Sequence, residues 1–145
     1  MLDTTCWYGE TAPADWEGRA QKALRDGLDS LAAFQLNRWF SAGFAEQNPE
    51  MGERLLDVFR SNDLDHYAAT CRAMGAMDLR ALVPAITAPT TVIVGAQDPA
   101  TDAELLRQLI PDTGLHVIPR CSHLSAVERP DAIARLLEAD LFTRI

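Results

Sequence analysis

The sequence predicts an α/β fold in which an all-helical segment precedes parallel strands that are joined by crossover helices. Two observations lead to this prediction. Between about residue 13 and residue 80, apolar residues recur at helical spacing and no low-complexity linker interrupts them. From residue 88 onward, two short apolar runs alternate with helical patterns, and the first run is continuous and β-branched, which is typical of a strand that is covered on both faces.

The first part is expected to form helices at residues 16–24, 28–40, 49–60 and 64–77. Asp15 stands before the first helix as a candidate cap. The second helix has the strongest pattern, because Leu31, Phe34, Leu36, Trp39 and Phe40 form an apolar stripe. The third begins at Asn48-Pro49-Glu50, which combines a capping side chain, a proline in the first turn and an acid near the positive helix end.

The second part is expected to form strands at residues 90–94 and 114–118. Between them, Thr101-Asp102-Ala103-Glu104 matches a capping box, so a helix should begin there and stop near Pro111. A last helix should run from Pro130 to about Leu141. Two parallel strands alone would leave unpaired backbone groups on both flanks. We therefore expect the sheet to need further strands, from a missing N-terminal half or from a second copy.

An acid and a base follow the two predicted strands. Asp98 comes after the first strand and His123 after the second, and the carboxyl ends of parallel strands open on the same crevice. Taken singly, Asp98 fits a turn and His123 fits a structural residue, but together they favour the acid and base of a Ser-His-Asp triad. The Gly-x-Ser-x-Gly elbow that carries the nucleophile is absent from all 145 residues. The sequence therefore predicts the later half of a hydrolase, inactive by itself.

Several segments resemble the α/β-hydrolase superfamily. Residues 92–101 (VIVGAQDPAT) resemble its acid loop and residues 121–130 (CSHLSAVERP) its histidine loop. Within the superfamily they are similar to 3-oxoadipate enol-lactonases, which open an enol-lactone in the β-ketoadipate pathway of aromatic breakdown. Residues 2–9 (LDTTCWYG) resemble the strand end that leads into the helical cap of that family. The resemblance implies a strand end at residues 1–12, a cap at 13–80 and the C-terminal core half at 81–145.

The resemblance also implies roles for individual residues. Asp98 corresponds to the triad acid and His123 to the general base. Trp39 is a candidate wall of the substrate pocket, with core packing as an equal alternative. Arg38 is a candidate for binding a substrate carboxylate, with a solvated helix arginine as the alternative. The implied substrate is a small lactone or ester, and neither a metal nor an organic cofactor is expected.

The composition of the chain excludes some classes of binding partner, and more than one function remains compatible with the sequence. The net charge of −8 argues against nucleic acid or an anionic membrane as a partner, and no apolar run is long enough to span a bilayer. Three cysteines without metal-ligand spacing suggest reduced thiols in the cytoplasm. The alternatives are another activity of the same fold (esterase, epoxide hydrolase or haloperoxidase) or an inactive module that self-associates through exposed strand edges.

Overall fold

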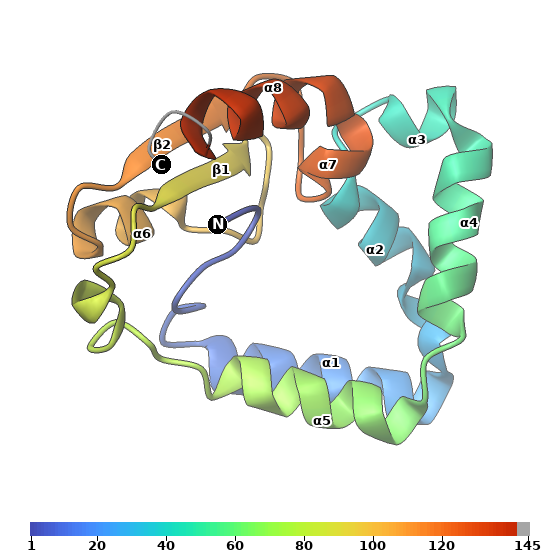
Figure 1. Cartoon of the computed structure of the whole chain (residues 1–145). Coiled ribbons are helices and arrows are strands. Elements are labelled where there is room, and N and C mark those ends of the chain that lie inside the picture. Colours follow the sequence, from blue (N-terminus) through green and yellow to red (C-terminus); the bar gives the residue numbers. More distant parts are fainter. Residues whose placement is uncertain (142–145) are drawn as a thin grey trace. The chain divides into compact units, whose positions relative to one another are not determined.

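The computed structural model describes residues 1–141, which form two compact units (Figure 1). The sheet unit contains Met1–Cys6, Arg38–Ser41 and the chain from Leu79 onward. The helical unit contains Trp7–Asn37 and Ala42–Asp78. No helix within the described range is both long enough and apolar enough to cross a bilayer.

The first half of the chain forms α1 (Ala12–Asp26), the 3-10 turn η1 (Leu28–Leu31), α2 (Ala32–Trp39), α3 (Phe44–Gln47), α4 (Pro49–Arg60) and α5 (Leu64–Gly75). α1 and α5 lie along each other (Figure 1). Their shared core consists mainly of small residues, which let the helix axes come close: Ala12, Trp16, Ala20, Ala68 and Cys71. The expected helical character of this segment is therefore present, with a short additional helix, α3.

Local details correct three expectations. α1 begins at Ala12 rather than Trp16, and Asp15 lies inside its first turn instead of capping it. The segment at 28–40 is a 3-10 turn followed by α2, and the Phe34 side chain is 50% exposed, beneath the Arg19 guanidinium. Asn48 precedes α4, but its side-chain amide donates to the carbonyl of Phe44 and makes no capping bond.

The second half forms the 3-10 turn η2 (Val83–Ala85), β1 (Thr91–Gly95), α6 (Ala103–Leu109), β2 (Gly114–Ile118), α7 (Ser125–Glu128) and α8 (Pro130–Leu141). β1 and β2 are parallel, in register from Thr91 opposite Gly114 to Gly95 opposite Ile118. α6 begins one residue later than the expected box, because the Asp102 carboxylate caps the backbone N–H of Leu105.

The other edge of β1 is paired with the first residues of the chain. Leu2 forms a parallel bridge with Ile93, whose carbonyl accepts from the N–H of Asp3 at 3.0 Å. β1 therefore lies between two extended segments, and its residues 92–94 are buried as a central strand requires. Val117 on β2 is 54% exposed, so one face of this outer strand is not covered within the described residues.

Candidate active site

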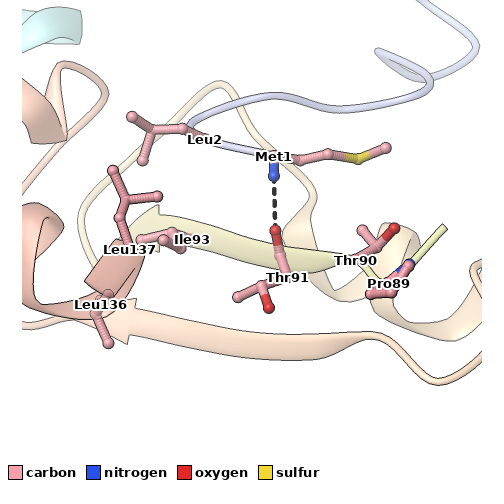
Figure 2. A pocket seen from close by; sticks show the side chains of 8 residues that line it. All are labelled: Met1, Leu2, Pro89, Thr90, Thr91, Ile93, Leu136 and Leu137. Atoms are coloured by element: carbon pink, nitrogen blue, oxygen red, sulfur yellow. Dashed lines mark hydrogen bonds between the residues drawn. The ribbon is translucent and has the colours of Figure 1, made fainter. Parts of the chain in front are cut away.

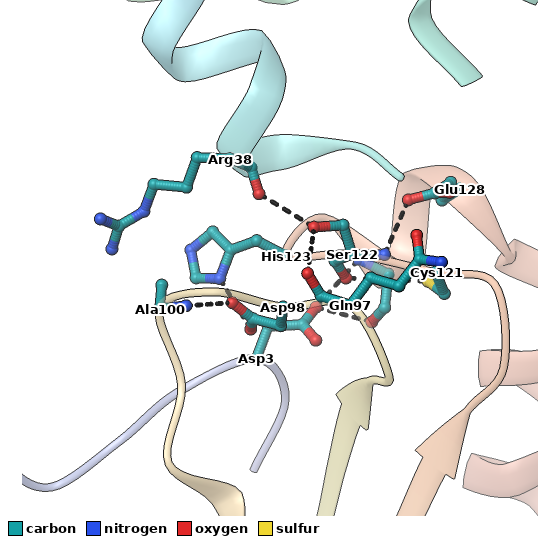
Figure 3. Close-up of polar contacts among 10 residues, drawn as sticks. Asp3, Arg38, Gln97, Asp98, Ala100, Cys121, Ser122, His123 and Glu128 are labelled. Atoms are coloured by element: carbon teal, nitrogen blue, oxygen red, sulfur yellow. Dashed lines mark hydrogen bonds and ion pairs between the residues drawn. The ribbon is translucent and has the colours of Figure 1, made fainter. Parts of the chain in front are cut away.

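Asp98 and His123 are in direct contact. Asp98 Oδ2 lies 3.0 Å from His123 Nδ1, and its Oδ1 accepts from the backbone N–H of Ala100 at 2.7 Å (Figure 3). The Asp98 side chain is fully buried, whereas 22% of the His123 side chain is exposed. An ionised carboxylate only accepts hydrogen bonds, so this contact holds the ring proton on Nδ1 and leaves Nε2 as the basic nitrogen.

The charge on Asp98 is maintained against burial. Burial is the largest single influence and raises the pKa of Asp98. Hydrogen bonds from His123 and from the N–H of Ala100 outweigh it, so the pKa of Asp98 is lowered from its ordinary value. The group is therefore a carboxylate at neutral pH, which is the form that orients an imidazole and stabilises its protonated state.

A close backbone approach brings the two loops together. The N–H of Ala96 donates to the carbonyl of Ile118, and that of Gln97 to Cys121, each at 2.9 Å. A Cβ at Gly95 would lie only 2.3 Å from the Ser122 carbonyl oxygen. Gly95 is therefore the residue that lets the end of β1 lie directly against the histidine loop, residues 121–130.

Glu128 ties the histidine loop to the end of α2. Its buried carboxylate accepts from the N–H of Ser122 at 2.9 Å and from that of Ser41 at 3.1 Å, and also from the Ser41 hydroxyl. Three donors on one buried carboxylate offset the cost of burying its charge. Sequence reasoning missed Glu128, because an isolated glutamate in a segment expected to be a loop gives no sign that it will be buried.

Arg38 and Trp39 are both partly buried, and their backbones contact the histidine loop. The Ser122 hydroxyl donates to the Arg38 carbonyl at 3.1 Å, and the N–H of Leu124 donates to the Trp39 carbonyl at 2.9 Å. The structure thus brings these two sequence candidates next to the loop that carries His123. The binding roles expected for their side chains stay predictions.

Asp3 is a second carboxylate at this edge of the sheet, and sequence reasoning assigned it no role. Its Oδ2 accepts from the backbone N–H and the hydroxyl of Ser125, at 3.0 and 2.6 Å. No local signal marked it, since residues 1–3 are too few to show a strand pattern. Cys121 is buried in the same region, and burial first, then the charges of Glu128 and Asp3, raise the pKa of its thiol to about 12. Such a thiol is not a nucleophile at neutral pH.

A small apolar groove lies elsewhere on the sheet unit. It encloses about 190 Å³ and is lined by Met1, Leu2, Pro89, Thr90, Thr91, Ile93, Leu136 and Leu137 (Figure 2). None of these residues belongs to the acid loop or the histidine loop. The groove lies beside the first residues of β1, whereas Asp98 comes after the last residue of that strand. We therefore do not assign the groove to the Asp98–His123 pair.

Comparison with known proteins assigns the chain to a family in which an acid–histidine pair of this kind is expected. A family model described as the alpha/beta hydrolase family matches residues 4–136, so the chain belongs to the alpha/beta hydrolase family. 3-Oxoadipate enol-lactonase 2 of Acinetobacter baylyi is 37% identical over 142 residues, which are 96% of this chain and 52% of that protein. 3-Oxoadipate enol-lactonase 1 of the same organism is 32% identical, over 83% of this chain and 46% of that protein.

Solved structures agree with this assignment. The enol-lactonase from Burkholderia xenovorans LB400 matches with a TM-score of 0.90 at 35% identity, covering 97% of this chain and 54% of that chain. A hydrolase from Pseudomonas aeruginosa PA01 matches with a TM-score of 0.88 at 30% identity and the same coverages. The predicted family resemblance and the predicted fold class are confirmed. The chain spans about half the length of the curated relatives it matches.

Proposed function

We propose that this chain supplies the acid and the base of a serine-type hydrolase that opens a small lactone or carboxylic ester. One observation carries the proposal: a fully buried carboxylate contacts Nδ1 of a partly exposed imidazole at 3.0 Å, at the carboxyl ends of adjacent parallel strands. The names of the relatives favour 3-oxoadipate enol-lactone as the substrate, which would place the reaction in aromatic catabolism.

In this proposal His123 acts through Nε2. It removes the proton from a serine hydroxyl as the hydroxyl attacks the substrate carbonyl, and later returns it to the leaving oxygen. Asp98 keeps the ring in the required tautomer and stabilises the positive charge that the ring gains. A water, deprotonated in turn by His123, then attacks the acyl-serine carbonyl, and the ring returns that proton to the departing serine oxygen. The chemistry needs no metal or organic cofactor, because protons move only between side chains, substrate and this water.

Arg38 and Trp39 are the proposed substrate contacts. The backbone carbonyls of both residues accept hydrogen bonds from the histidine loop, so their side chains start close to the reacting centre. A guanidinium binds a carboxylate through two parallel hydrogen bonds, and an indole provides a flat apolar wall. We propose that residues 13–80, which include both of these residues, form the cap of the enzyme.

The nucleophile is proposed to come from outside these 145 residues. No Gly-x-Ser-x-Gly motif is present in them, and the serine and the oxyanion donors supply most of the transition-state stabilisation in such enzymes. An N-terminal hydrolase half is the proposed source. A second copy of this chain would complete strand pairing but would not add the motif.

The test is rescue by complementation. The purified chain is mixed with a second polypeptide that contains a Gly-x-Ser-x-Gly elbow. This polypeptide is taken from the part of A. baylyi 3-oxoadipate enol-lactonase 2 that the present chain does not match. We expect hydrolysis of an enol-lactone by the mixture, and loss of at least about 100-fold with His123→Ala or Asp98→Asn. His66→Ala is the matched control, because the His66 side chain is 91% exposed on α5. Equal activity of the His123→Ala and His66→Ala mixtures would refute the assignment.

Two alternatives are separated by the same preparation. Hydrolysis of a short-chain ester but not of the lactone would indicate an esterase. Hydrolysis by the chain alone, lost in His123→Ala, would mean that it contains a nucleophile outside the known motif. A stable dimer that neither hydrolyses substrate nor responds to the second polypeptide would support a self-associating module instead.

A further inference from the structure

We propose that Asp3 is a positioning residue of this site, a second carboxylate that stabilises the protonated His123 ring together with Asp98. The proposal rests on the roles proposed above for Asp98 and His123. It assigns to the first residues of the chain a part in the chemistry that goes beyond pairing with β1.

The fold places three chemical groups at one edge of the sheet. Leu2 is bridged to β1, and β1 is paired with β2, so three extended parallel segments lie side by side. Asp3, Asp98 and His123 follow the ends of these three segments in that order. Parallel strands bring their carboxyl ends to a common edge, and Figure 3 shows Asp3 and Asp98 beside the loop that carries His123.

Asp3 is held in a defined orientation. Its backbone N–H donates to Ile93, while its Oδ2 accepts both hydrogen bonds from Ser125, a fully buried residue on the histidine loop. Its φ of 47° lies in the left-handed region, which aspartate adopts more readily than most residues. The carboxylate is therefore fixed against the loop two residues beyond His123.

The second oxygen of Asp3 is the unusual feature. Asp3 Oδ1 is buried and has no hydrogen-bond partner within the described part of the chain. Buried polar atoms without partners are rare in folded proteins, and a role in the chemistry of a site is one reason for them to persist. The groups that act on Asp3 through their charge are His123 and Asp98, and Asp3 in turn acts on the Cys121 thiol.

The electrostatic coupling has a definite direction. The pKa of Asp3 is raised, mainly by burial and to a smaller extent by the negative charge of Asp98. The hydrogen bonds from Ser125 and the positive charge of His123 act in the opposite direction and lower this pKa. A protonated His123 ring therefore makes the charged form of Asp3 easier to bury. When His123 accepts a proton, its new positive charge is stabilised by two carboxylates in place of one.

The test measures the titration of His123 by NMR on the 145-residue chain, which needs no catalytic turnover. In Asp3→Asn, a near-isosteric change, we expect the midpoint of the His123 ring titration to move to lower pH by about 0.5 to 1 unit. Ser125→Ala is the matched control, because it removes a hydrogen bond to Asp3 and keeps the charge. It should move the midpoint by less than half as much. His66 provides an internal standard that should not move.

Two results would overturn the proposal. One is an unchanged His123 midpoint in a folded Asp3→Asn chain, which would make Asp3 purely structural. The other is an equal shift in Ser125→Ala, which would show that loop geometry and not charge is responsible. If Asp3→Asn does not fold, the ¹³Cγ resonance of Asp3 in the unaltered chain decides. An inflection at the His123 midpoint supports the coupling, and its absence refutes it. Failed complementation would count against the proposed function and leave this result standing.

Discussion

Replacing Gly95 by alanine should separate the acid from the base. The added Cβ would lie 2.3 Å from the Ser122 carbonyl oxygen and 2.5 Å from that of Cys121, where real Cβ atoms keep at least 3.0 Å. Both obstacles are backbone atoms, so β1 and the histidine loop must part by about 0.7 Å or more. The Asp98–His123 contact of 3.0 Å would lengthen beyond hydrogen-bonding distance if it took up that shift.

The cost follows from overpacking a buried position. We expect Gly95→Ala to lower the free energy of unfolding by about 2–3 kcal/mol, since inserted methyl groups in packed cores cost about 1–3 kcal/mol and no flexible side chain relieves this one. A urea denaturation series measures the change. The downfield proton resonance of His123 Nδ1–H reports the hydrogen bond directly, and it should broaden or disappear.

Gly18→Ala is the matched control for this substitution. Gly18 lies within α1, and a Cβ there would meet no atom within 4 Å. The same chemical change should therefore stabilise the chain by about 0.5–1 kcal/mol through helix propensity. The reasoning is refuted if Gly95→Ala unfolds within about 0.5 kcal/mol of the unaltered chain and keeps the His123 resonance.

Three further outcomes follow from the site. Because the pKa of Asp98 is lowered on folding, its carboxylate stabilises the fold above the ordinary pKa of 3.8, and this stability is lost as the pH falls through the pKa of the folded state. Asp98→Asn should therefore cost about 1–3 kcal/mol of unfolding free energy at pH 7 and less at pH 3, and equal costs in urea melts at the two pH values would contradict this. Glu128→Ala leaves three donors unpaired, one buried and two partly buried, and should cost about 3 kcal/mol, whereas Glu128→Gln keeps an acceptor and should cost under half of that. Equal costs would argue against the carboxylate's role. The Cys121 thiol, with its pKa raised to about 12, should resist iodoacetamide at pH 8 until urea unfolds the chain, and rapid labelling of the folded chain would show that it is accessible.

The elements that the sequence predicted are those set by local patterns. β1 and β2 were found because short β-branched runs are bounded by turn residues, and α8 because Pro130 starts it. The start of α1 was missed because Pro13 fits a first helical turn as well as a break, and the pattern does not distinguish the two. α3 and α7 were missed because each has only four residues, too few for periodicity to appear.

The residues of the site also fall into those that a local sequence pattern predicted and those that it did not. Asp98 and His123 were predictable because each follows a strand that can be recognised from the sequence. Asp3 was not, since residues 1–3 are too few to give a strand pattern, and Leu2 is recognised as part of the sheet only by its bridge to Ile93. The contact of Glu128 with Ser41 joins residues 87 positions apart, and no local rule anticipates such a pair.

The histidine loop is positioned by residues outside itself. Asp3 holds it through Ser125, Gly95 allows the close backbone contact at Ser122, Asp98 fixes the ring, and the end of α2 is bound through Glu128. All of these contacts lie within the sheet unit and are formed without a nucleophile. A preorganised acid–base pair is the costly part of such a site to assemble, because every supporting group must be ordered at once. Complementation should therefore depend on docking of the second polypeptide. The Asp98–His123 hydrogen bond should already be detectable before that polypeptide is added.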